Sequence, residues 1–250
     1  MQHYKNAIIT ISIGNRSWIQ NTTELLKDYA LKVNADFFIE SEIDEYFKKN
    51  ISITNKKRPN ILAYAMKSFV VWKYLEIYDK VLVIDDTCCI SPLTPNIFDV
   101  VPNNLIGFVK EPSHNTKCFN FLKEKQVEIE YNRDNYANSG VIVYPKEVKM
   151  YFSPENIIKH QYLLGCRYPH QALTYYIIQS NKLDLYRLPY SYNYLPGLDI
   201  LSNDERKCSK NPYNFLDRKK YIYHYTGVYR NRKEIIAETC NQLKNFKEKQ

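Results

Sequence analysis

Residues 81–92, VLVIDDTCCISP, place four aliphatic residues directly before two aspartates. A continuous apolar run of this kind is typical of a strand buried on both faces, as in parallel sheets that helices cover on each side. In such sheets, ligands bind at the carboxyl ends of the strands. The stretch therefore predicts a central strand, with Asp85 and Asp86 leaving the sheet at the edge where a ligand would bind.

The chain before this strand alternates between strand and helix patterns. Residues 6–14 and 35–40 are apolar enough for strands, and residues 21–34 carry apolar side chains at helical spacing. A polar and basic stretch over 41–58 predicts a loop, and an apolar helix pattern follows over 60–78. This alternation predicts an α/β fold with a Rossmann-like, mostly parallel central sheet flanked by helices.

The second half is less regular. We find no internal repeat, low-complexity tract or flexible linker there, which predicts a single two-lobed domain over residues 1–250. The candidate elements are strands at 105–109, 139–144, 183–189 and 221–226 and helices at 154–164, 169–180 and 233–246.

The composition is that of a soluble globular protein, with 44% hydrophobic and 25% charged residues. No apolar run is long enough to cross a bilayer, and the first residues lack the pattern of a signal peptide. We therefore expect a cytoplasmic protein, or one in the host cytoplasm if the chain is viral. The six cysteines form no C-x-x-C pair, so we expect free buried thiols.

The net charge of +8 has three interpretations. The basic residues, which gather late in the chain, could face nucleic acid, an anionic small substrate such as a nucleotide diphosphate, or only solvent. The sequence contains no helix-turn-helix, zinc or RNP pattern. We therefore expect no nucleic-acid partner.

Two interpretations of the aspartate pair stay open on its sequence alone. A carboxylate cluster at a strand end often holds a hard cation with a phosphate on its other side. Mg²⁺ or Mn²⁺ would serve, and Mn²⁺ also accepts an imidazole. An isolated pair of aspartates more often caps the turn that follows it.

Three later stretches carry further signal: YANSGVIVYP (136–145), RLPYSYNYLP (187–196) and YIYHYTGVYR (221–230). With YDKVLVIDDT they form an ordered set of four. Together the four resemble the retaining glycosyltransferases of the GT-A fold in family 8, the glycogenin-like enzymes. In these enzymes a strand ends in D-x-D and is followed by N-[SA]-G, a D-Q pair, L-P-x-x-Y-N and H-x-x-G-x-x-K, an order matched over about residues 5–233.

The resemblance implies a GT-A fold and a metal-dependent glycosyltransferase. Such an enzyme would move a sugar from a nucleotide-sugar donor, a UDP-sugar, to an acceptor hydroxyl with retention of configuration. The cofactor would be Mn²⁺ or Mg²⁺, and the acceptor a glycan, a protein or a small molecule. About residues 1–110 would be the nucleotide-binding half, 111–235 the acceptor-binding half and 236–250 a C-terminal helix or tail.

The resemblance also implies four candidate metal ligands. Asp85 matches the first aspartate of D-x-D, and His224 matches the metal-ligating histidine. Thr87 stands where the second aspartate is expected. Either Asp86 supplies the other carboxylate, or Thr87 contributes a hydroxyl or a water contact.

Three further residues match family positions, and two of them, Gly227 and Arg230, match positions at the donor diphosphate. Gly227 would let the backbone approach the phosphates. Arg230 replaces the phosphate-binding lysine, and its guanidinium suits phosphate oxygens. Lys67 matches a basic residue on the helix before the metal strand, although a solvated helix lysine is an equal alternative.

The sugar site is implied by two further motifs. Asn138 and Ser139 match the Asn-Ser-Gly that touches the donor sugar, although a turn before a strand explains them equally well. Gln171 matches the glutamine of the D-Q pair, and His170 replaces its aspartate. The candidate catalytic residues are Asn138, Gln171 and Arg230.

The nucleotide base would contact the first strand. Ile11 and Ile13 are candidates for backbone contacts, with Trp18 or Tyr64 as stacking partners. An aromatic residue near a strand end belongs to the core more often than to a ligand site.

Two other functions remain as alternatives. The departures at Thr87 and His170 allow a catalytically inactive module that binds sugar nucleotides. A haloacid-dehalogenase-type phosphatase also places an aspartate after an aliphatic strand, but it needs D-x-D-x-[TV] and a nearby glycine, which DDTCC lacks.

Overall fold

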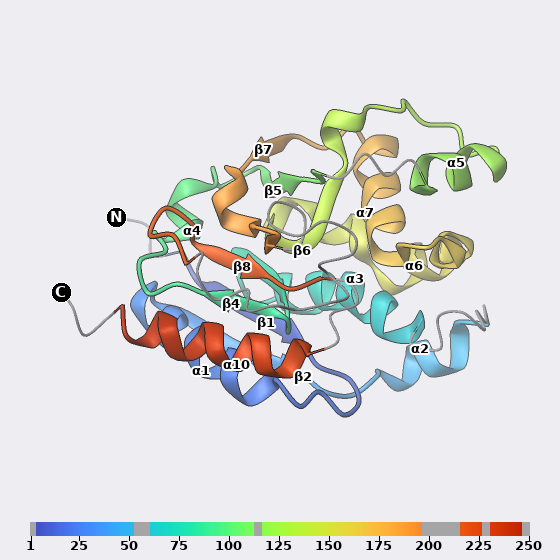
Figure 1. The fold of residues 1–250 in the computed structure, drawn as a ribbon. Helices are drawn as coiled ribbons and strands as arrows, with labels where there is room; N and C mark the ends of the chain where they lie inside the picture. Colours follow the sequence, from blue (N-terminus) through green and yellow to red (C-terminus); the bar gives the residue numbers. More distant parts are fainter. Residues whose placement is uncertain (1–3, 53–60, 113–116, 197–215, 227–230, 247–250) are drawn as a thin grey trace.

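The computed structural model describes residues 4–52, 61–112, 117–196, 216–226 and 231–246. Its centre is a six-stranded sheet (Figure 1). The strands are β1 (Asn6–Ile11), β2 (Ala35–Glu40), β3 (Lys80–Asp85), β5 (Ile106–Lys110), β6 (Ala137–Pro145) and β7 (Leu185–Arg187), in the spatial order β2-β1-β3-β6-β5-β7.

Five of these strands run in one direction, and β6 alone runs against them. This arrangement confirms the α/β class and the mostly parallel sheet, in which β1 and β3 are neighbours. A separate two-stranded antiparallel sheet pairs β4 (Cys88–Ile90) with β8 (Ile222–His224).

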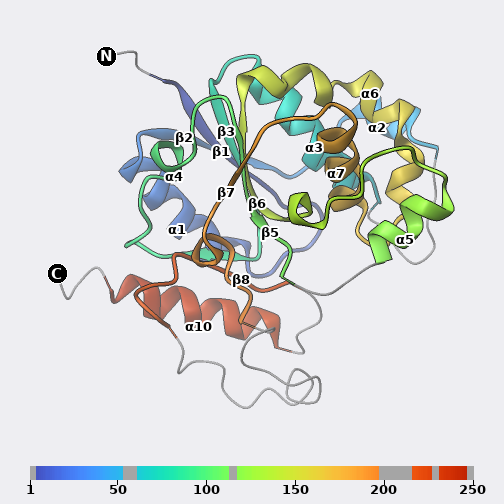
Figure 2. The same cartoon turned by 90° about the horizontal axis from the view of Figure 1, so that it is seen from above.

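The helices lie on both faces of the six-stranded sheet (Figure 2). Helices α1 and α10 lie together on one side, and α3 and α7 lie together on the other (Figure 1). The helices are α1 (Ile19–Lys32), α2 (Glu45–Asn50), α3 (Ile61–Leu75), α4 (Ile97–Val100), α5 (Lys117–Glu124), α6 (Pro154–Lys159), α7 (Pro169–Ser180) and α10 (Arg232–Lys244), with 3₁₀ turns η1 (Arg133–Asn135), η2 (Lys146–Phe152), η3 (Gln161–Gly165) and η4 (Tyr190–Asn193).

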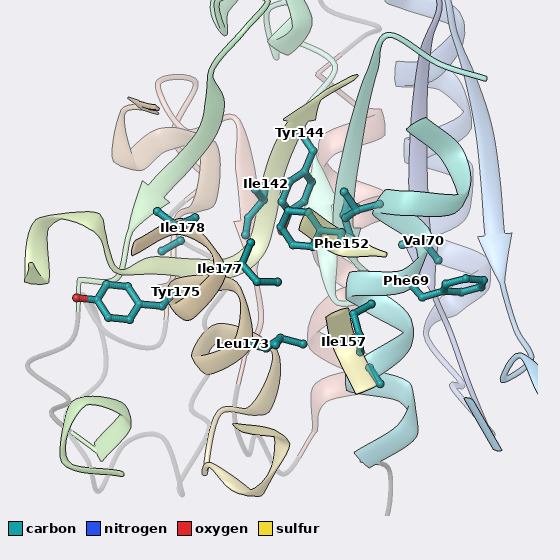
Figure 3. Packing of buried hydrophobic residues seen from close by; sticks show 14 of the residues in the cluster. Phe69, Val70, Ile142, Tyr144, Phe152, Ile157, Leu173, Tyr175, Ile177 and Ile178 are labelled. Carbon is teal, nitrogen blue, oxygen red and sulfur yellow. The ribbon is translucent and has the colours of Figure 1, made fainter. Parts of the chain in front are cut away.

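Both faces of β3 are buried, as the apolar run predicts. Val81 and Val83 belong to the hydrophobic cluster that holds α3 and α7, whereas Leu82 and Ile84 belong to the cluster that holds α1 and α10. The alternation follows from the two-residue period of a strand. Figure 3 shows the first cluster, where Ile142 and Tyr144 of β6 lie among side chains of α3, η2, α6 and α7.

The structure corrects two predicted elements. The loop predicted over 41–58 is wrong at Glu45–Asn50, which forms α2, because the side chain of Asp44 caps its first turn by accepting a hydrogen bond from the Tyr46 N–H. The rest of that stretch from residue 53 lies outside the described residues. The helix predicted over 154–164 ends at Lys159, and a 3₁₀ turn follows it.

Three short elements were not predicted. Strand β4 forms by pairing with β8, far along the chain, so no local pattern announces it. Helix α4 has only four residues. Helix α5 buries Cys118, Phe119 and Leu122, a helical spacing that the sequence does carry.

The expectation of free buried thiols is confirmed for the five cysteines that the structure describes, and Cys208 lies outside the described residues. In the described ranges, no helix has the length and apolar character needed to cross a bilayer.

Several chain segments meet at one end of the strands of the six-stranded sheet, which we call this edge of the sheet. The carboxyl ends of β1, β3 and β5 meet there, and the start of β6 joins them because β6 is antiparallel. The register pairs Ile11 with Asp85, Ile84 with Val141 and Lys110 with Ala137. The sheet therefore brings Asp85, Glu111, Asn138 and Ser139 to the same edge.

Candidate functional site

Asp85 and His224 lie side by side at this edge. Their sequence positions differ by 224 − 85 = 139. The antiparallel pairing of β4 with β8, which places Cys88 opposite His224, brings the two segments together. Nε2 of His224 lies 3.3 Å from Oδ2 of Asp85. Ligands of one cation must lie close together, and the structure brings these two of the four implied ligands into contact.

Lys67 of α3 reaches the same carboxylate. Its ammonium donates to Oδ1 of Asp85 and, at 2.9 Å, to the backbone carbonyl of Ser139. The lysine is only 8% exposed, so the alternative of a solvated helix lysine is wrong. Burial alone would raise the pKa of Asp85, but the charge of Lys67 and the contact with His224 outweigh it and hold that pKa well below its usual range.

Asp86 faces a different environment. Its carboxylate accepts a hydrogen bond from the Ser12 hydroxyl at 3.3 Å and lies 3.6 Å from Nε of Arg16. Its backbone carbonyl accepts from the hydroxyl of Thr22 on α1. Burial raises the pKa of Asp86, and the charge of Arg16 opposes that rise. The two neighbouring carboxylates therefore have separate sets of partners.

Thr87 is also buried, and its backbone carbonyl accepts from the N–H of Tyr225 just after β8. This bond helps to join the turn after Asp86 to the segment that carries His224. The hydroxyl of Thr87 stays a candidate for a contact with a cation or its water.

The resemblance implies a transfer reaction at this site, and replacing Asp86 by asparagine is expected to lower its rate by less than about tenfold. The reason is that the Asp86 carboxylate interacts with Ser12 and Arg16, whereas His224 lies beside Asp85. The measurement is the initial rate over a Mn²⁺ titration, with the same substitution at Asp85 as the matched comparison. Removing an essential electrostatic contact typically costs about 10²–10³-fold. A loss of that size in the Asp86 variant, with a weaker Mn²⁺ response, would identify Asp86 as a ligand.

Two predicted sugar-site residues share one carboxylate. Nδ2 of Asn138 and Nε2 of Gln171 each donate to Oε2 of Glu111 at 2.9 Å. Nε2 of Gln171 also donates to the carbonyl of Ala137 at 3.0 Å, so both of its hydrogens are engaged and its Oε1 is the atom left to accept from a ligand. The sequence interpretation missed Glu111, which follows β5 and belongs to no quoted motif.

Asn193 connects this group to His224. Its Oδ1 lies 2.9 Å from Nδ1 of His224, and its Nδ2 donates to Oδ1 of Asn138 at 2.9 Å. Asn193 ends the turn η4, and it is the asparagine of the Leu-Pro-aromatic-x-Tyr-Asn stretch. The motif signalled this residue, although the sequence interpretation gave it no role.

Steric crowding at this site explains why residue 140, the glycine of Asn-Ser-Gly, has no side chain. A Cβ built on it would lie closer than 3.0 Å to Cε1 and Nδ1 of His224, a separation that real Cβ atoms essentially never show. The imidazole therefore packs directly on the backbone of β6, and any larger residue at 140 would displace it.

His170 opens α7 and is 2% exposed. Its Nε2 lies 3.3 Å from the hydroxyl of Thr174, whereas its Nδ1 has no hydrogen-bond partner among the described residues. Burial, together with the charge of Lys67, lowers the pKa of His170 well below its ordinary value. The ring is therefore neutral at pH 7 and cannot replace the negative charge of the aspartate expected at this position.

The candidate residues for binding the nucleotide base have different interaction partners. Ile11 ends β1 with its backbone between β2 and β3, and the carbonyl of Ile13 accepts from Nε of Arg16. The guanidinium groups of Arg16 and Arg232 lie 5.5 and 5.4 Å from the ring of Trp18.

Tyr64 lies on α3 and is partly buried. Gly227 and Arg230 lie outside the described residues.

The pair formed by Asp85 and His224 fits a cation. Nε2 of His224 is a buried atom without a hydrogen-bond partner among the described residues, although Oδ2 of Asp85 is 3.3 Å away. Two ligands of one cation with bonds of about 2.2 Å at right angles would lie about 3.1 Å apart.

Within the described ranges, no group of three His, Cys, Asp or Glu side chains is placed to hold a metal. Substrate phosphates and water, the usual environment of Mg²⁺, could supply further ligands of a cation beside Asp85 and His224.

No family model matches the sequence, and no curated protein matches it either. Among solved structures, the chain is similar to a glycosyltransferase involved in the glycosylation of the major capsid of PBCV-1. The identity is 14% and the TM-score 0.54, over 96% of this chain and 99% of that chain. It is also similar to mouse xyloside xylosyltransferase 1 in its apo form, at 11% identity and a TM-score of 0.50, over 89% of this chain and 98% of that chain.

Both solved structures are GT-A glycosyltransferases, so the expected GT-A fold is confirmed. At these low identities the likeness establishes the fold alone. The closer resemblance to family 8 and to glycogenin-like enzymes stays a prediction from the motifs.

Proposed function

We propose that this protein is a metal-dependent glycosyltransferase that moves a sugar from a UDP-sugar to an acceptor hydroxyl, with retention of configuration. The observation that carries the proposal is the meeting of Asp85 and His224, which the ordered motifs require and nothing local in the sequence enforces. The fold, shared with solved GT-A glycosyltransferases, supports the same conclusion.

Asp85 and His224 would hold Mn²⁺ or Mg²⁺ against the donor diphosphate. A bound cation of this kind would stabilise the charge that develops on the leaving diphosphate. Lys67 fixes the Asp85 carboxylate through Oδ1, which leaves Oδ2 turned toward His224. The protein thereby orients one oxygen of Asp85 before any ligand arrives, and preorganisation of this kind is the main source of electrostatic catalysis.

The amide groups beside this pair would face the sugar. Oε1 of Gln171 is available to accept from a sugar hydroxyl, while Glu111 holds both Gln171 and Asn138 in place. The sugar would pass through an oxocarbenium-like state, as in other glycosyl chemistry. The departing phosphate could take the proton of the acceptor, which suits a site whose nearby histidine, His170, is a weak base because burial lowers its pKa.

A second candidate is a module that binds sugar nucleotides without transferring the sugar. It is favoured by the small number of ligands that converge among the described residues, because Asp86 faces Arg16 and the ammonium of Lys67 already occupies Oδ1 of Asp85. In that case Lys67 would supply the positive charge near the diphosphate, and a divalent cation would be unnecessary.

UDP is expected to raise the melting temperature more with Mn²⁺ than with EDTA, because a ligand that binds only the folded state stabilises it. At about 100 times Kd the gain is about 2.7 kcal/mol, a rise of about 5–10 °C for a chain of this size. Thermal shift with UDP, UDP-sugars and GDP-sugars provides the measurement. Equal shifts with EDTA and no release of UDP from any donor would favour the binding module.

A further inference from the structure

We propose that Asn193 is a positioning residue that keeps a proton on Nδ1 of His224, so that Nε2 faces Asp85 as the ligand for a cation. The proposal rests on the proposed function, because it concerns the same cation site. Asn193 would act through His224 and would touch neither the donor nor the acceptor.

The argument begins with the orientation of Asn138, whose oxygen and nitrogen are fixed by two independent neighbours. The Glu111 carboxylate can only accept a hydrogen bond, so Asn138 must present Nδ2 to it, at 2.9 Å. The backbone N–H of Gly140 can only donate, so Asn138 must present Oδ1 to it, at 3.1 Å. Both neighbours require the same orientation of the amide, which is otherwise ambiguous in a structure.

The orientation of Asn138 determines that of Asn193. Oδ1 of Asn138 can only accept, so Asn193 must approach it with Nδ2, as it does at 2.9 Å. Oδ1 of Asn193 is then turned toward His224 and lies 2.9 Å from Nδ1. At that separation an amide oxygen needs a donor, so Nδ1 must carry a proton.

Burial makes this requirement strict. Asn193 is 0% exposed, His224 2% and Asn138 6%, so solvent cannot easily replace a missing partner. With the proton of a neutral ring on Nε2 instead, two buried acceptors would face each other at 2.9 Å, and an unpaired polar group in the interior is costly.

The proton on Nδ1 leaves Nε2 as the nitrogen that can bind a cation. Nε2 is the ring atom that lacks a hydrogen-bond partner among the described residues and that lies beside Asp85. Metal-binding histidines commonly donate their other ring N–H to a neighbouring acceptor, which sets the tautomer and the ring orientation. Glu111, Asn138 and Asn193 would form that support here.

The first test uses the unmodified protein without metal. Nitrogen-15 NMR of the histidine rings at about pH 8.5, above the ordinary titration range of histidine, should show a proton on Nδ1 of His224. Assignment would come from the loss of the signal in His224→Gln. A ring that carries its proton on Nε2 alone would overturn the proposal without any reference to activity.

The second test compares two substitutions of Asn193. Asn193→Leu removes the oxygen that accepts from Nδ1 of His224 and keeps a side chain of similar size. The ring proton should then move to Nε2, where it faces Asp85. Loss of such a supporting contact typically lowers metal affinity by about 10–100-fold, here measured for Mn²⁺ by electron paramagnetic resonance. Asn193→Asp keeps an oxygen toward Nδ1, so the proton should stay there and Mn²⁺ affinity should be retained.

The matched pair separates positioning from simple packing. Asn193→Asp places a buried carboxylate oxygen against Oδ1 of Asn138, so it should lower the melting temperature at least as much as Asn193→Leu. Equal losses of Mn²⁺ affinity in the two variants would therefore show a merely structural role.

Failure of the proposed function would look different. It would appear as wild-type protein that binds no Mn²⁺, whatever the position of the His224 proton. The position of that proton decides the Asn193 proposal by itself, and the Mn²⁺ titration of the wild type decides the cation site.

Discussion

Asp85→Asn is expected to reduce metal-dependent sugar transfer by roughly 10²–10³-fold, the usual cost of removing a central electrostatic contact in an active site. Asparagine keeps the volume of the side chain but removes the charge that faces both Lys67 and His224. The affinity for Mn²⁺ should fall with the rate. The measurements are the release of UDP from the preferred UDP-sugar and a Mn²⁺ titration.

This substitution also leaves the buried ammonium of Lys67 without its ionic partner. We therefore expect a lower melting temperature, because breaking a buried ion pair costs about 3–5 kcal/mol when one charge stays behind. The double variant with Lys67→Met should regain stability without regaining transfer. Full metal-dependent turnover in the single variant would exclude Asp85 from the cation site and favour the turn-capping interpretation.

Gly140→Ala is expected to displace the imidazole of His224, because the added Cβ would lie closer than 3.0 Å to two of its ring atoms. Forcing an extra methyl group into a packed interior costs about 1–3 kcal/mol. We expect a melting temperature lower by about 2–12 °C and a transfer rate lower by roughly 10²-fold or more. The rate should fall because, in the proposed cation site, His224 has to lie beside Asp85.

Gly107→Ala is the matched control for this effect. Gly107 lies on β5 in the same sheet, and a Cβ there would clash with the side chain of Val101 and not with His224. Both variants should lose stability, and only Gly140→Ala should lose Mn²⁺ affinity in the folded protein. Comparable losses of Mn²⁺ affinity in both would mean that general destabilisation, not displacement of His224, explains the result.

Much of the sheet could be predicted from local patterns. The apolar run before Asp85 predicted a strand buried on both faces, and β3 is such a strand because α3 and α7 cover one face of it and α1 and α10 cover the other. Strand β4 could not be predicted, because three residues carry little periodicity and their pairing partner lies more than 130 positions away. Its existence depends on contacts that the whole fold creates.

Within the site, the sequence pointed to the residue types and the tertiary structure chose their partners. Successive residues of a strand face opposite sides, so Asp85 continues the side of Val83 and meets Lys67 of α3. Asp86 lies toward α1, where Thr22 reaches its backbone. The alternation could have predicted that the two carboxylates separate, although only the packing of α3 and α1 decided which one meets His224.

The roles of two supporting residues, Asn193 and Glu111, were not predicted from the sequence. Asn193 stood in a recognisable motif, so its position was signalled and only its partner was missing. Glu111 belongs to no motif, because a carboxylate that follows a strand can have many roles. Its role here depends on hydrogen bonds from Asn138 of β6 and Gln171 of α7.

The sequence by itself determined the strand order along the chain, the buried character of β3 and the presence of an aspartate, an asparagine and a histidine in the expected order. Only the tertiary structure decided that Asp85, Lys67, Asn193 and His224 share one place. The physical reason is that periodicity reports which side of an element a residue faces, whereas a contact between distant segments depends on how all the elements pack together.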